Sequence, residues 1–172
     1  GHLAGMVVLV AGERRAPSLD RIGDEHRRSV GCDGLELLEQ AFDAVAAECH
    51  AVQHAVALFD QSSMAKFMVQ GRDACAVLNR LGTADVDVAP GRVVYTQWLN
   101  ERGGIEADLT VTRLASDRFM VVTSVASHVR DLAWLQRHID ADDRCTVTDI
   151  TSGLALLSVM GPNSRSLLQR VS

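Results

Sequence analysis

An acidic residue inside a predicted strand is the strongest candidate for chemistry in this sequence. Asp108 lies four residues after Gly104, in a β-rich run that begins at Ile105. Because successive side chains of a strand point to opposite faces, the polar face is expected to hold Glu106, Asp108, Thr110 and Thr112, and the core face Ile105, Ala107, Leu109 and Val111. Asp is disfavoured in strand interiors. A carboxylate fixed there can accept a proton or orient an amine; the alternative is a solvent-facing Asp on an open sheet face.

Other polar groups in the sequence favour ordinary roles. His50 and His54 have the spacing of two helical metal ligands, but no third ligand is evident, which favours a solvated helix face. The acidic cluster of Asp140, Asp142 and Asp143 lacks the Gly and closing Glu of a calcium loop. The four cysteines form no Cys-x-x-Cys pair, so we expect reduced and mostly buried thiols and no metal site.

The elements that would position Asp108 can be read from hydrophobic periodicity. Residues 100–104 separate two β-rich runs, which predicts a hairpin with a five-residue connection. Ser127 is a plausible N-cap for a helix that ends near Ile139. Residues 1–36 have weak periodicity and indicate an irregular lead-in. The remaining predicted elements are helices over 35–58 and from Asp73 to Leu81, and strands over 66–70, 92–99, 105–114, 118–124, 145–150 and 154–160.

Two segments of the chain are similar to each other. Both Lys66 to Leu81 and Leu156 to Val171 contain a strand, a Gly, a capping Asp or Asn two residues later, and a helix. This predicts a duplicated α+β fold with a mixed or antiparallel sheet and flanking helices, although strand-Gly-helix joints are also common in unrelated folds. The predicted domains are a first repeat over 37–151 and the start of an incomplete second repeat over 152–172.

Composition limits the possible partners. The chain has 172 residues, of which 47% are apolar and 23% are charged, as expected for a globular domain. A net charge of −5 and scattered basic residues argue against nucleic acid, and no apolar run is long enough to span a bilayer. Neither a secretion signal nor a polybasic stretch is evident, so we expect a cytoplasmic protein that binds neither nucleic acid nor a membrane.

The segment around Asp108 resembles a known family. Tyr95-Thr-Gln-Trp-Leu-Asn-Glu-Arg-Gly-Gly-Ile-Glu-Ala-Asp108 is similar to the central motif of the aminomethyltransferase family, which includes the T-protein of glycine cleavage. The similarity extends from about Ala46 to Val171 and includes Gly71-Arg-Asp-Ala74 and Val159-Met-Gly-Pro-Asn163. The segment Phe59-Asp-Gln-Ser-Ser63 resembles the dimethylglycine and sarcosine dehydrogenase branch of the family more than the T-protein itself.

The resemblance implies a folate-dependent mechanism. Tetrahydrofolate would take up a methylene group from a small amine or aminomethyl donor, giving 5,10-methylenetetrahydrofolate, and FAD would belong only to a separate domain outside this chain. Asp108 is the implied catalytic residue, oriented toward the N10 of folate. The implied folate-binding residues are Met64, Tyr95, Thr110, Thr123 and Ser124.

The resemblance also implies that half of the site is missing. Further folate-recognising residues of the family would lie beyond Ser172, so we expect a truncated chain that binds folate weakly or not at all alone. An uncovered sheet face would favour self-association. Two alternatives therefore stay open: a non-enzymatic folate-binding or scaffold relative, and a self-associating interaction module.

Overall fold

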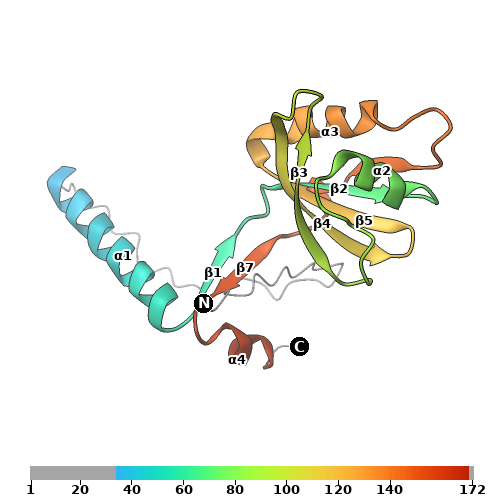
Figure 1. Ribbon diagram of the computed structural model, residues 1–172. Coiled ribbons are helices and arrows are strands. Elements are labelled where there is room, and N and C mark those ends of the chain that lie inside the picture. The colour runs from blue at the N-terminus through green and yellow to red at the C-terminus, as the bar shows by residue number, and fades with distance from the viewer. Residues whose placement is uncertain (1–33, 171–172) are drawn as a thin grey trace. The chain divides into compact units, whose positions relative to one another are not determined.

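The computed structural model describes residues 34–170, with side chains from residue 44 onward. It forms two compact units, one made by the described residues up to Asp60 together with Leu157 onward, and one made by Gln61–Leu156. The elements labelled in Figure 1 are α1 (Gly34–His54), β1 (Ala57–Asp60), β2 (Ala65–Gln70), α2 (Ala74–Leu81), β3 (Val93–Leu99), β4 (Ile105–Ala115), β5 (Arg118–Thr123), α3 (His128–Arg137), β6 (Thr146–Asp149), β7 (Leu157–Met160) and α4 (Ser164–Leu168). The predicted lead-in over 1–36 lies almost wholly outside the described residues.

The unit 61–156 is built on a five-stranded antiparallel sheet. Its strand order is β3-β4-β5-β2-β6, with short 3-10 helices η2 (Val125–Ser127) and η3 (Thr151–Gly153) next to α3 and β6. One face carries alternate apolar residues of the strands, which pack with α2 and α3 into a single cluster. The cluster includes Phe67, Val69, Val77, Leu78, Trp98, Leu109, Val111, Phe119, Val121 and Leu135. The predicted α+β fold with an antiparallel sheet and flanking helices is confirmed.

The first predicted helix ends earlier than its periodicity indicates. Helix α1 ends at His54, and residues 57–60 form strand β1, which pairs with β7. Its expected apolar positions Val45 and Cys49 are exposed. The prediction of mostly buried thiols is therefore wrong for Cys49, whereas Cys75 and Cys145 are half-buried and Cys32 lies outside the described residues. Strand β1 was missed because its partner follows it by almost a hundred residues of chain, beyond any local pattern.

The two similar segments form strand-to-helix joints of the same geometry. Gly71 follows β2 with φ 137° and Gly161 follows β7 with φ 120°. A Cβ atom on Gly71 would lie 2.1 Å from the Arg144 carbonyl oxygen, and one on Gly161 would lie 2.5 Å from that of Ala55. The same two carbonyls accept the N–H groups of the N-cap residues that precede the helices, Asp73 and Asn163. Backbone contact at this distance explains why both joints use Gly.

The duplication is not arranged as two consecutive segments. Strand β7 begins the second similar segment, but it pairs with β1, which precedes the first one. The strand that begins each similar segment therefore has an antiparallel neighbour in its own unit: β6 pairs with β2, and β1 pairs with β7. The domain boundaries at 36, 151 and 172 stay a prediction.

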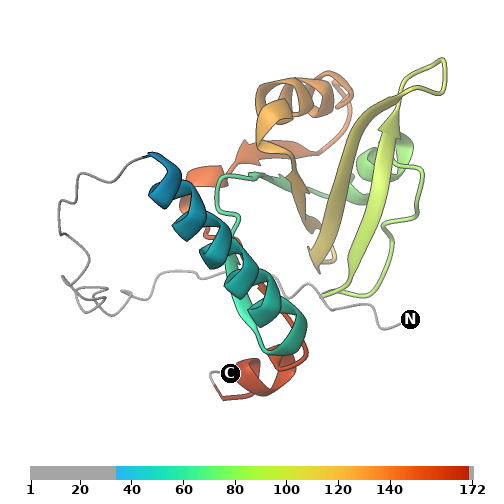
Figure 2. The ribbon, with the colours of Figure 1, turned by 90° about the vertical axis from the view of Figure 1, so that its left-hand side faces the viewer.

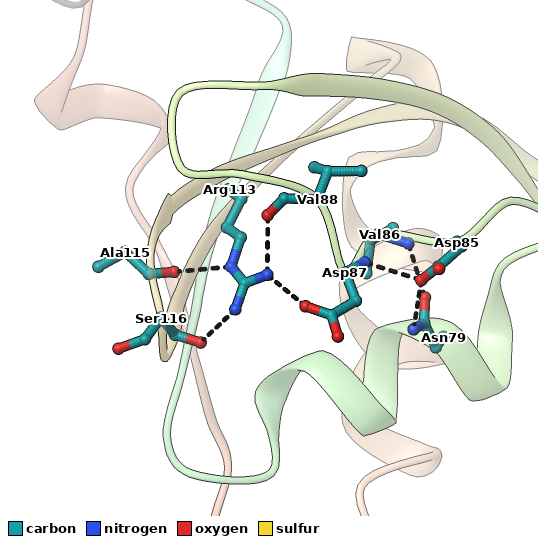
Figure 3. Close-up of polar contacts among 8 residues, drawn as sticks. All are labelled: Asn79, Asp85, Val86, Asp87, Val88, Arg113, Ala115 and Ser116. Atoms are coloured by element: carbon teal, nitrogen blue, oxygen red, sulfur yellow. Dashed lines mark hydrogen bonds and ion pairs between the residues drawn. The ribbon is translucent and has the colours of Figure 1, made fainter.

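A half-buried guanidinium holds the long connection between α2 and β3 (Figure 3). Arg113 of β4 donates Nη1 to the Val88 carbonyl at 2.7 Å and to the Asp87 carboxylate, and Nη2 to the Ser116 carbonyl at 3.2 Å. The Asn79 side chain binds the same connection by accepting the N–H of Val86 at 2.7 Å. Charged donors of this kind give short, strong hydrogen bonds. The connection consequently has a fixed path even though it has little regular structure of its own.

Carboxylates accept hydrogen bonds at several loop junctions, and these bonds lower the pKa of Asp73, Asp85, Asp143 and Asp149. Asp149 accepts the Thr151 hydroxyl at 2.6 Å and the Thr151 N–H at 2.9 Å, and it contacts His128 Nε2 at 2.7 Å. Asp73 was expected to cap α2, but its carboxylate instead accepts the N–H of Arg144 at 2.9 Å. The bonds of Asp73, Asp143 and Asp149 to Arg144, Arg80 and His128 join segments distant in sequence, and the remaining bonds fix the local turns.

Substitution of Gly71 is expected to destabilise the sheet far more than substitution of another left-handed glycine. We expect Gly71→Ala to lower the free energy of unfolding by about 3 kcal/mol or more, because a Cβ atom meets the Arg144 carbonyl. Gly91→Ala is the matched control: Gly91 has φ 86° and open space around it, so the loss should be about 1 kcal/mol. Urea unfolding followed by tryptophan fluorescence measures both, since Trp98 and Trp134 lie in this unit. Equal losses in the two variants would contradict the close-contact argument.

Acid is expected to unfold the chain through these carboxylates. The folded-state pKa of Asp149 is lowered, so between that pKa and the unfolded-state value the unfolded chain binds more protons. The stabilisation is therefore present above about pH 4, near the ordinary pKa of Asp, and is lost as the pH falls through the folded-state pKa. Asp149→Asn should flatten this acid dependence of the unfolding free energy, whereas Asp142→Asn, in an exposed loop, should leave it unchanged. The proposal for Asp149 is refuted if the two variants have the same acid profile as the parent chain.

Candidate functional site

The candidate site is the open face of the β3–β4 hairpin. In β4 the side chains of Ala107, Leu109 and Val111 are buried in the core, as predicted from the alternation. The prediction is wrong for Ile105, which is 68% exposed because an irregularity in the β3–β4 pairing separates it from Ala107. Asp108 is exposed on the opposite face and Thr110 is half-buried beside it. The hairpin and its bend extend from the end of the sheet (Figure 2).

Two residues of β3 lie beside the predicted pair. Gln97 is opposite Asp108 and Tyr95 is opposite Thr110, so these four side chains share the open face. The Tyr95 side chain is exposed at 61%. The carboxylate of Asp108 raises the pKa of the Tyr95 phenol, and the side chain of Gln97 lowers it. The structure therefore brings together Tyr95, Asp108 and Thr110 of the predicted site and adds Gln97.

A row of side chains connects this group to Met64. Thr110 pairs with Val122 of β5, and Val122 pairs with Lys66 of β2, so their side chains share one face. Lys66 is only 1% exposed, and its Nζ donates to the carbonyls of Ser62 at 2.9 Å and of Met64 at 2.8 Å. Met64 is half-buried in the turn held by this amine. Lys66 was missed as a site residue because one lysine in a strand has no local signature.

The bend before Asp108 is held by Asn100. Its Oδ1 accepts the N–H groups of Arg102 at 3.0 Å and Gly104 at 2.9 Å, and its Nδ2 donates to the Glu106 carboxylate at 2.7 Å. Gly103 has φ 77°, and a Cβ atom on Gly104 would lie 2.9 Å from Asn100 Nδ2. The spacing Asn-x-x-Gly-Gly is therefore a requirement of the bend, and that spacing was the available signal for Asn100.

The hairpin contains a β-bulge next to the candidate carboxylate. Trp98 pairs with Ala107, but the next pair is Leu99 with Ile105, so Glu106 has no opposite residue. Bulges bend a strand and redirect its side chains, and they are common beside functional sites. The bulge ends two residues before Asp108.

A buried carboxylate lies where β5 leads into α3. Asp131 is 1% exposed, and its Oδ2 accepts the hydroxyls of Thr123 and Ser127, each at 2.6 Å. Its Oδ1 accepts Nε of Arg130 at 3.1 Å. Ser127 holds the predicted N-cap position of α3, but its hydroxyl donates to Asp131 instead of capping the helix.

Thr123 and Ser124 differ in position from the other predicted residues. Thr123 pairs with the buried Ala65 and follows Val121 by two residues, so it lies on the core face, opposite Asp108. Ser124 accepts the N–H of Ala126 at 3.2 Å and begins the 3-10 helix η2. The structure therefore places Thr123 away from the open face, and it gives the Ser124 hydroxyl a capping role at η2. A role for them in ligand contacts stays a prediction.

The open face is a platform rather than an enclosed cavity. Two hollows of about 790 and 530 Å³ are found in the described part of this unit, and Asp108 lines neither. The smaller one lies beside the bend and is lined by Leu99, Asn100, Glu101, Arg102, Glu106, Trp134, Arg137 and His138. Between residues 44 and 170 no three His, Cys, Asp or Glu side chains gather in a way that could hold a metal ion. Among the described helices, none is long and apolar enough to cross a membrane.

Comparisons with known proteins agree with the geometry. The model of the GCVT N-terminal domain family matches residues 18–172. The chain is 48% identical over 131 residues to 4-methylaminobutanoate oxidase (formaldehyde-forming) from Paenarthrobacter nicotinovorans, covering 76% of this chain and 16% of that protein. It is 32% identical over 160 residues to the aminomethyltransferase of Bacillus velezensis, covering 92% of this chain and 43% of that protein.

A solved structure supports the same relationship. The glycine cleavage system aminomethyltransferase T from Bartonella henselae matches with a TM-score of 0.68 and 31% identity, over 73% of this chain and 34% of that protein. The chain thus spans less than half the length of these relatives. The oxidase match agrees with the predicted dehydrogenase and oxidase branch. This chain belongs to the GCVT N-terminal domain family, the family of the aminomethyltransferases.

Proposed function

We propose that this chain supplies the folate-facing sheet of a tetrahydrofolate-dependent one-carbon transfer domain. The observation that carries the proposal is the exposed Asp108 carboxylate beside the exposed Tyr95 ring, on a rigid hairpin just past the Gly103-Gly104 bend. Membership in the aminomethyltransferase family supports folate as the one-carbon acceptor.

The residues on the open face fit a pterin. Tyr95 offers an exposed aromatic surface, on which a flat heterocycle can stack. Asp108 offers an acceptor for N–H groups, and Thr110 and Gln97 add polar contacts within the same row. Met64, whose carbonyl accepts the Lys66 amine at the far end of this row, has a flexible thioether that suits a flat ring. When bound, tetrahydrofolate supplies the amine nitrogens that take up the one-carbon unit.

Asp108 has the role of holding or accepting a proton at the reacting amine. A general base must lie within hydrogen-bond reach of the proton that it removes, and a strand holds a side chain more firmly than a loop does. The Tyr95 phenol is close enough for Asp108 to raise its pKa, so the carboxylate has a donor beside it that orients it in the absence of ligand. The pair would exchange that contact for the folate amine on binding.

The donor proposed for the complete protein is a small methylated amine. The Paenarthrobacter relative is an oxidase of 4-methylaminobutanoate that forms formaldehyde. A carbon at the formaldehyde oxidation level is the one that a methylene bridge between two folate nitrogens requires. Amine oxidation itself would belong to a separate domain, where FAD would bind.

Loss of the Asp108 charge is expected to lower the pKa of Tyr95. Tyr95 is the sole tyrosine of the chain, so its titration can be followed by one ¹³Cζ resonance without assignment. Because the Asp108 carboxylate raises the pKa of the phenol, Asp108→Asn should return it toward about 10. Asp117→Asn, which removes an exposed carboxylate from the turn between β4 and β5, should leave the titration midpoint unchanged. The assigned contact is wrong if the Asp108→Asn midpoint equals that of the parent chain.

Tetrahydrofolate is expected to bind the open face weakly. We expect titration to millimolar concentration to shift the Tyr95 resonance and the amide signals of β3 and β4, because the ring would stack on Tyr95. Asp108→Asn should weaken this binding, and Asp117→Asn should retain it. Shifts confined to other elements, or equal binding by Asp108→Asn and the parent chain, would contradict the proposed function. Sedimentation of the same samples shows whether the chain self-associates during the titration.

A further inference from the structure

The bulge at Glu106 carries a backbone contact from a different element. The carbonyl oxygen of Glu106 accepts Nη2 of Arg130 at 2.5 Å. Glu106 is the residue that the β3–β4 ladder leaves without an opposite partner. A bulged residue interrupts the regular ladder, so its backbone groups need other partners. Arg130 is therefore the partner that α3 supplies to the bulge.

Arg130 is itself held by the buried carboxylate. The Arg130 side chain is 60% exposed, and a long side chain at that exposure is normally mobile. Its Nε, however, donates to Oδ1 of Asp131, whose Oδ2 is fixed by the hydroxyls of Thr123 and Ser127. The guanidinium thus faces the 1% exposed Asp131 carboxylate with both Nε and Nη2, each 3.1 Å from Oδ1, while Nη2 also reaches the carbonyl of the bulge.

We infer that Arg130 is a positioning residue for the candidate site, which bridges Asp131 to the bulge at Glu106 and thereby fixes the direction of Asp108. The inference rests on the proposed function for the identity of the ligand. The bridge itself is independent of any ligand. Sequence alone did not single out Arg130, because an exposed arginine at the start of a helix has no distinctive pattern.

The geometry of the bulge explains why the bridge matters for Asp108. A strand that slips by one residue turns every side chain to the opposite face. The bulge at Glu106 sets the register of the strand that follows it, with Asp108 outward and Ala107 and Leu109 inward. A bulge held by Arg130 keeps this register, whereas a relaxed bulge lets the carboxylate move relative to Tyr95.

Arginine suits this role better than lysine. Its planar fork has several N–H donors in fixed directions, so Nε and Nη2 can bind two acceptors at once. A lysine keeps the positive charge but has a single nitrogen. Arg130→Lys therefore removes the two-acceptor geometry while it keeps the positive charge, whereas a neutral substitution would remove both.

The test reads the Tyr95 ¹³Cζ resonance and its titration midpoint with no folate present. We expect Arg130→Lys to move the midpoint at least half of the way toward that of Asp108→Asn, because the carboxylate loses its fixed position. Arg137→Lys is the matched control, since it makes the same change on the same helix at a side chain that lies over the Trp134 ring. It should leave the Tyr95 resonance at its parent value.

A double-mutant cycle shows whether the effect passes through Asp108. Adding Arg130→Lys to Asp108→Asn should change the Tyr95 midpoint no further, because the group that Arg130 positions is then absent. A parent-like midpoint in folded Arg130→Lys, or an equal shift with and without Asp108, overturns the inference. Urea unfolding checks that each variant is folded. If Arg130→Lys is not, Arg130→Gln replaces it, with Arg137→Gln as the control for the lost charge. Absence of folate binding would refute the proposed function alone, since this readout needs no folate.

Discussion

The hydrogen bonding of one buried carboxylate determines how the site is supported. Asp131 is almost fully removed from solvent, and a buried carboxylate without donors would be strongly destabilising. Its donors come from the end of β5, from the start of α3 and from the adjacent Arg130. Satisfying Asp131 therefore fixes the first turn of α3 against the sheet. That arrangement also brings the Arg130 guanidinium to the strand that carries Asp108.

The bend and the bulge transfer this constraint along the hairpin. Asn100 closes the bend by binding backbone N–H groups on one side and the Glu106 carboxylate on the other. Arg130 binds the carbonyl of the same Glu106. Glu106 is thus contacted through both its side chain and its backbone, in a position where the ladder itself provides no opposite residue. These two independent contacts at the bulge fix the register of β4, and with it the face from which the Asp108 side chain projects.

The sequence predicted the parts of the site that depend on local patterns. Alternation of apolar residues in 107–111 was sufficient to assign Asp108 and Thr110 to one face, but it failed at Ile105, where the pairing with β3 is irregular. The position of Tyr95 before the bend placed it on the neighbouring strand. The pairing of Lys66 with Val122, the contact of Arg130 with Glu106 and the pairing of β1 with β7 were not predictable, because each joins residues far apart in the chain. Thr123 shows the same limit. From the sequence its hydroxyl was expected to contact a ligand, but in the structure it donates a hydrogen bond to the buried Asp131.

Exposure of the platform determines what chemistry these residues can perform by themselves. Tyr95 and Asp108 lie on an open face, where water screens a carboxylate and competes for its hydrogen bonds. A carboxylate in that setting can orient an amine, but transfer of a reactive one-carbon unit requires exclusion of water from the reacting atoms. Under the proposed function, the described residues would supply the oriented carboxylate, the stacking surface and their support. A bound heterocycle would itself cover Tyr95 and part of Asp108, so the remaining enclosure must come from surface that these residues do not provide.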